Sequence, residues 1–82
     1  MKSVVYSANA LRDRRKYANM AGRLDKALSE YASGDGAHAN NVKQLSGSSA
    51  KRLRVANFRV VFEETDDTVL VTSIGPRGSI YE

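Results

Sequence analysis

The sequence contains no cysteine, a single histidine and no apolar run longer than a few residues. The lack of cysteine excludes disulfide bonds and thiolate metal sites. The short apolar runs predict neither a membrane-spanning helix nor a signal peptide. We therefore expect a small cytoplasmic protein that is held together by an apolar core, with or without help from a bound partner.

The single histidine also narrows the possible chemistry. His38 lies in a polar stretch between Gly36 and Asn40, where it lacks the cysteine partners of a zinc site and is a poor centre for a Ser–His–Asp triad. The glycine pair around Asp35 is not followed by the Lys-Ser/Thr of a phosphate-binding P-loop. We expect no metal and no cofactor.

Positive charge is in excess. Thirteen Lys and Arg residues stand against nine Asp and Glu, which gives a net charge of +4. This balance favours an anionic partner, either nucleic acid or an acidic protein. The alternative is a basic surface that does no more than keep the protein in solution.

The first part of the chain predicts a strand followed by helices. Residues 2–6 are β-branched and aromatic, as in a strand. Ser7 is placed to cap a helix in which apolar residues recur at helical spacing over residues 8–18. We expect a break in this helix at Asn19 or Gly22.

A second amphipathic helix is predicted over residues 20–31, ending in the turn-forming residues 33–36. Residues 37–50 are polar, and we expect an irregular segment anchored to the core by Val42 and Leu45.

The rest of the chain alternates with a period of two, as strands do. Turns are predicted at Ala56-Asn57, where Asn tolerates a left-handed backbone, and at residues 65–67. The acidic residues around that second turn, Glu63 to Asp67, are read as a solvated turn. The expected strands cover residues 52–55, 58–63, 68–74 and 77–81.

One strand, two helices and a run of three or four strands define an α+β fold. We expect residues 1–82 to form a single domain, in which the N-terminal strand and two helices pack on one face of a 3–4-stranded antiparallel sheet.

Basic residues concentrate in the strand-rich half. Strand parity places Arg52 and Arg54 on one face, and it turns Arg59 away from its apolar neighbours. With Arg77 and Tyr81 these side chains are expected to converge on the exposed side of the sheet. Guanidinium groups suit phosphate because their planar fork donates two parallel hydrogen bonds. An exposed face that is merely solubilised by arginine is the alternative.

Four segments of the sequence form a recognisable series of motifs: residues 41–47, 51–62 and 69–77, and then Ile80-Tyr81. They contain Lys-x-Leu-x-Gly, a basic strand, an aromatic-Arg strand and Gly-x-Arg followed by Tyr. This series resembles the core of the RelE/ParE toxins.

The resemblance implies a microbial RNase-like fold and metal-independent cleavage of messenger RNA in the ribosomal A site. In that scheme Arg59 clamps the phosphate, Arg77 stabilises the transition state, Tyr81 stacks on a base or assists proton transfer, and Arg52 lies near the nucleophile. Further RNA contacts are expected from three basic residues: Lys43, Lys51 and Arg54.

The sequence also departs from the family pattern. Ala50 stands where the family carries an active-site lysine, and Lys51 falls on the opposite strand face from Arg52. Arg52 is a poor general base because its guanidinium does not lose its proton. The base therefore stays unassigned.

Two other functions stay open on this reading. The first is a ParE-like toxin that inhibits DNA gyrase without cleaving RNA. The second is a toxin-derived binding module that survives as half of a complex. In every case the resemblance implies a cognate antitoxin as partner, with the ribosome and messenger RNA as further partners of an RNase.

Overall fold

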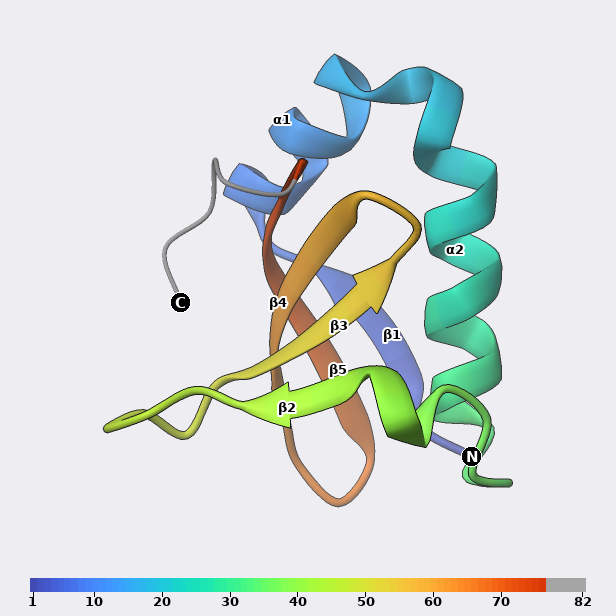
Figure 1. Cartoon of the computed structure of the whole chain (residues 1–82), viewed down its shortest axis with the longest axis vertical. Coiled ribbons are helices and arrows are strands. Elements are labelled where there is room, and N and C mark those ends of the chain that lie inside the picture. The colour runs from blue at the N-terminus through green and yellow to red at the C-terminus, as the bar shows by residue number, and fades with distance from the viewer. Residues whose placement is uncertain (77–82) are drawn as a thin grey trace.

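The computed structural model describes residues 1–76. Two α-helices, one short 3₁₀-helix and five strands follow one another along this part of the chain (Figure 1). The elements are β1 (Ser3–Tyr6), α1 (Ala8–Lys16), α2 (Ala18–Ala32), η1 (Ala39–Asn41), β2 (Val42–Gln44), β3 (Lys51–Val55), β4 (Phe58–Glu64) and β5 (Thr68–Pro76).

The strands form one sheet in the order β1-β5-β4-β3-β2. The predicted α+β class is confirmed, but the sheet has five strands and is mixed, because β1 pairs in parallel with β5. The fifth strand, β2, lies within the segment predicted to be irregular and pairs with β3. The predicted strand over residues 77–81 lies outside the described residues.

The first helix begins where the sequence predicts, but the break that follows it comes earlier, and the second helix begins at Ala18 and not at residue 20. The Ser7 hydroxyl caps α1 by accepting a hydrogen bond of 3.1 Å from the amide of Ala10. The break falls at Tyr17 (φ −111°, ψ 48°) and not at Asn19 or Gly22. The ring of Tyr17 packs edge-on against Phe58, with 5.1 Å between centroids, and this contact fixes the corner between α1 and α2.

The core lies between the helices and one face of the sheet. Phe62, at its centre, is fully buried and packs against the ring of Tyr31 from α2, with 5.3 Å between centroids. Its largest fully buried side chains are Phe62, Leu24, Leu28, Leu53, Val60, Val69 and Val71. No helix of the described chain is long and apolar enough to cross a membrane.

Two irregularities shape the strand-rich half. The β3–β4 turn has its left-handed residue at Ala56 (φ 53°), whereas the sequence suggested Asn57. The register of β4 and β5 shifts between Val61 and Phe62, and the Thr72 hydroxyl donates to the Val61 carbonyl there, at 3.2 Å. This bulge keeps β5 side chains directed into the core on both sides of the shift.

Candidate nucleic-acid interface

The face of the sheet opposite the core gathers positive charge. In the β2–β3 pairing Lys43 stands opposite Arg52, and in the β3–β4 pairing Arg54 stands opposite Arg59. Strand alternation directs these four side chains away from the core residues Leu53 and Val60 on the same strands. We call Lys43, Arg52, Arg54 and Arg59 the basic face. The structure thus brings together four residues that the sequence predicted as site residues.

Arg59 is the most constrained of the four. It lies within β4, it is only 8% exposed, and its β5 neighbour in the register is Gly75, which has no side chain. A buried guanidinium keeps its charge, because its pKa is too high for the group to neutralise. The side chain is therefore a fixed cation, whereas Arg54 opposite it is exposed.

Like charges directly opposite each other in a sheet destabilise it. Arg54 and Arg59 are such a pair, and Arg54 and Lys43 form no ion pair with any described residue. An arrangement that repels itself gains stability when an anion lies between its members. The basic face is therefore suited to a phosphate group.

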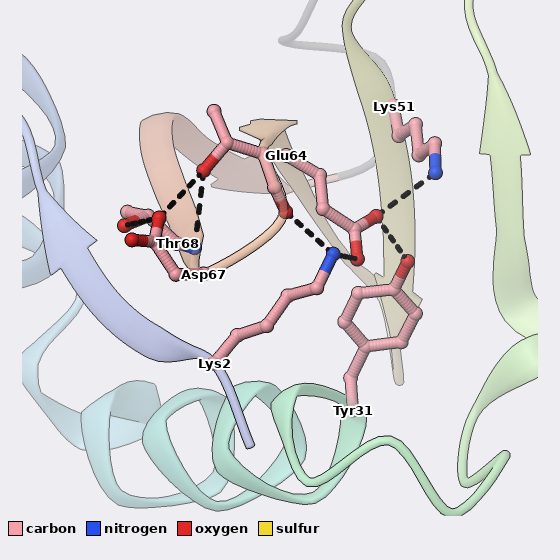
Figure 2. Close-up of polar contacts among 7 residues, drawn as sticks. Lys2, Tyr31, Lys51, Glu64, Asp67 and Thr68 are labelled. Atoms are coloured by element: carbon pink, nitrogen blue, oxygen red, sulfur yellow. Dashed lines mark hydrogen bonds and ion pairs between the residues drawn. The ribbon is translucent and has the colours of Figure 1, made fainter.

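Lys51 is not part of this face. It points to the helix side, where its Nζ donates to Glu64 at 2.9 Å (Figure 2). Lys2 donates to the other Glu64 oxygen at 2.7 Å, and the Tyr31 hydroxyl donates at 2.7 Å. One carboxylate on β4 thus joins α2, β3 and the residue just before β1. We call Glu64 with Lys2, Tyr31 and Lys51 the Glu64 cluster.

The Glu64 cluster changes two pKa values. Burial disfavours the ionised carboxylate, but hydrogen bonds from Lys2, Lys51 and Tyr31 outweigh that cost and lower the pKa of Glu64 to about 2. Burial, together with the hydrogen bond to the Glu64 carboxylate, raises the pKa of Tyr31 to about 12. Both groups therefore keep one charge state at neutral pH, as structural groups do.

The sequence analysis did not predict this role for Glu64, which was read as part of a solvated acidic turn. In the structure its side chain is only 14% exposed. The signal was available in the strand parity, because Glu64 shares a face with the core residues Val60 and Phe62.

A second polar cluster joins the two helices. The Asp25 carboxylate accepts from the Tyr6 hydroxyl at 2.5 Å and from two nitrogens of Arg14. The hydrogen bonds from Arg14, opposed by burial, lower the pKa of Asp25. Asp13, which precedes Arg14 on α1, accepts a hydrogen bond of 3.0 Å from the backbone amide of Ile74. This bond attaches α1 to β5 beside the basic face.

The single histidine has a local partner. His38 Nε2 lies 2.8 Å from a carboxylate oxygen of Glu30, and its backbone is left-handed (φ 65°). Within residues 1–76 no group of three His, Cys, Asp or Glu side chains is arranged to hold a metal ion. Two other predicted site residues, Arg77 and Tyr81, lie outside the described residues.

Comparison with known proteins identifies the fold. No protein-family model matches the sequence, and no curated protein matches it significantly. Comparison with solved structures shows that the chain has the fold of the RelE-like toxin superfamily. This confirms the resemblance seen in the sequence.

Three solved structures illustrate the match. The isolated E. coli RelE toxin superposes with a TM-score of 0.75 and 21% identity, over 98% of this chain and 88% of that chain. The RelB–RelE antitoxin–toxin complex from Methanococcus jannaschii gives 0.73 and 20%, over 94% of each chain. A mutant of E. coli RelE in complex with a peptide of the antitoxin RelB gives 0.72 and 25%, over 95% of this chain and 85% of that chain.

Proposed function

We propose that this chain is the toxin of a type II toxin–antitoxin system and acts as a metal-independent, ribosome-dependent endoribonuclease that inhibits translation. The observation that carries the proposal is the pairing of Arg54 with the buried Arg59 on a sheet with the RelE fold. The fold supplies the class of protein, and the paired guanidinium groups supply a phosphate site within it.

The chemistry follows from the charge that develops during RNA cleavage. The 2′-hydroxyl loses its proton and attacks the adjacent phosphate, while the bond from phosphorus to the 5′-oxygen of the next nucleotide breaks. That oxygen takes up a proton, so the products are a 2′,3′-cyclic phosphate and a 5′-hydroxyl. The phosphorane transition state between them carries more negative charge than the substrate. A fixed donor aimed at that charge contributes about 3–4 kcal/mol where water is excluded. Arg59 suits this role because burial fixes its position, and Arg54 and Arg52 flank it on β3.

The remaining roles rest on the sequence resemblance. Arg77 stabilises the transition state, and Tyr81 stacks on a base or assists the proton transfer. Arg52 contributes charge and not proton abstraction, because a guanidinium does not deprotonate at neutral pH. Lys51 contributes indirectly by fixing β3 through Glu64.

The proposed partners are a cognate antitoxin, the ribosome and messenger RNA, which places the protein in the cytoplasm. Two of the three structures described above are complexes of RelE with RelB or a RelB peptide. A net charge of +4 and an exposed Arg54 favour an acidic antitoxin segment on electrostatic grounds.

The test is cleavage of messenger RNA on purified programmed ribosomes, read by primer extension. We expect the wild-type protein to produce discrete new 5′ ends within the reading frame. Arg59→Ala should slow cleavage by about 10²–10³-fold, the loss typical of one donor to a developing anion. Lys26→Ala is the matched control, since it removes a positive charge from the exposed side of α2.

Because Arg59 is buried, each variant is first checked for folding by circular dichroism, and Arg59→Lys is measured beside it. Arg59→Lys keeps the positive charge but loses the bidentate fork, so it should restore only part of the cleavage rate. Growth arrest with intact transcripts would instead favour the gyrase-inhibiting alternative. Unchanged cleavage by both folded Arg59 variants would contradict the proposed role of the basic face.

A further inference from the structure

A hollow lies at the end of the β2–β3 hairpin, next to the basic face. Its volume is about 200 Å³, and it is lined by Lys43, Gln44, Leu45, Ser46 and Arg52. Pockets for whole small molecules measure roughly 300–1,000 Å³, so this one suits a single chemical group of a larger ligand.

The loop that forms the hollow is well defined by hydrogen bonds. The amide of Leu45 donates to the Ala50 carbonyl at 3.0 Å, and the amide of Ser48 donates to the Leu45 carbonyl at 3.3 Å. The Gln44 side chain donates to the Ser48 carbonyl, also at 3.3 Å. Gly47, at φ 71°, makes the tight turn between them. These bonds hold the wall of the hollow in place without a ligand.

The position of the hollow relates it to the proposed cleavage site. Lys43 and Arg52 form one row of the outer sheet face, and Arg54 and Arg59 form the next row. Residues two apart on a strand are separated by roughly 6.6–6.8 Å. Successive phosphates of an extended RNA strand are separated by a similar step, so one strand can place neighbouring phosphates on the two rows.

The lining chemistry selects an anion. Lys43 contributes an exposed ammonium group that forms no ion pair with the described residues, and Arg52 contributes a guanidinium from the facing strand. The hydroxyl of Ser46 adds a donor, and Leu45 provides an apolar wall. A nucleotide has this combination of groups, since its phosphate is anionic and its sugar is partly apolar.

We propose that the hollow between Lys43 and Arg52 binds the phosphate of an RNA nucleotide that flanks the cleaved one. This binding determines which phosphodiester bond lies next to Arg59. This inference rests on the proposed ribonuclease function and extends it. It assigns Lys43 to substrate positioning and gives the β2–β3 loop a binding role.

The experiment is a thermodynamic cycle between the protein and the substrate. Single-turnover cleavage on programmed ribosomes is measured for wild type, Lys43→Ala and the control Lys26→Ala. The messenger RNA carries an uncharged methylphosphonate at one position at a time, excluding the cleaved bond. Lys43 is exposed on an edge strand, so its truncation leaves the core intact.

We expect Lys43→Ala to slow cleavage of the unmodified RNA by about two- to tenfold, the loss typical of one ordinary hydrogen bond. At one flanking position the methylphosphonate should slow the wild type and leave Lys43→Ala unaffected. The coupling there should be at least about twofold, and the other positions should be additive. Lys26→Ala should behave as the wild type throughout.

Additive effects at every position would overturn the subsite and leave the ribonuclease function standing. Coupling of equal size for Lys26→Ala would also overturn it, because the effect would then be one of general charge. Absence of cleavage by the wild-type protein would overturn the proposed function itself, and the subsite with it.

Discussion

On the helix-covered face of the sheet Lys2 and Lys51 donate to the single carboxylate of Glu64, whereas on the outer face Arg54 stands opposite Arg59. The first arrangement places opposite charges together and joins α2, β3 and β4 to the residue just before β1. The second places like charges together within an otherwise regular pairing. Charge on the inner face therefore serves stability, whereas on the outer face the like charges of Arg54 and Arg59 repel each other.

The largest effect on stability is expected in the core on the inner face of the sheet, next to Glu64. Phe62 is fully buried between α2 and the sheet, and we expect Phe62→Ala to lower the free energy of unfolding by about 3–5 kcal/mol. Urea denaturation measures this loss. A fall in the free energy of unfolding of less than about 1 kcal/mol would show that packing on the inner face does not stabilise the fold.

The Glu64 cluster should produce a smaller and pH-dependent effect. Replacing Glu64 by Gln leaves Lys2 and Lys51 without their shared carboxylate, and we expect a loss of about 1–3 kcal/mol at neutral pH. The folded pKa of about 2 lies below the ordinary 4.5. The contribution of Glu64 is thus complete above pH 4.5 and is lost as the pH falls toward 2.

Urea denaturation over this pH range, with Glu63→Gln as the control, tests the prediction. Glu63 is the exposed neighbour on the same strand. The wild type and Glu64→Gln should converge in stability as the pH approaches 2, whereas Glu63→Gln should follow the wild type. A constant gap between wild type and Glu64→Gln at all pH values would exclude an ionic role for Glu64.

The smallest effect on stability is expected on the outer face. Arg54→Ala removes the repulsion with Arg59, so the free energy of unfolding should stay within about 0.5 kcal/mol of wild type or rise. Cleavage of messenger RNA by the same variant should fall. A clear loss of stability in Arg54→Ala would remove the distinction between the two faces.

Much of this comparison could be predicted from the sequence, because strand parity is a local property. Alternation of charged and apolar residues along β3 and β4 placed Arg52, Arg54 and Arg59 on one face, and the register confirms it. The Ser7 cap was also predictable, since a hydroxyl just before a helical pattern has a local role.

The features that escaped prediction depend on contacts between distant residues. The three residues of β2 carry no apolar alternation of their own, and their strand state comes from pairing with β3. The neighbour of Arg59 in the sheet is likewise distant in sequence, since Gly75 lies sixteen residues further on in β5. The partner of Lys51, on β4, was hidden because Glu64 was read as part of a turn.

The parallel pairing of β1 with β5 has a consequence for synthesis of the chain. Val5 pairs with Leu70, so β1 can pair only after almost all of the described chain has been synthesised. At roughly 5–20 residues per second, that delay is several seconds on the ribosome. Arg59 also gains its neighbour Gly75 only then. A nascent chain therefore completes its sheet, with β1 paired and Gly75 beside Arg59, only after β5 has been made.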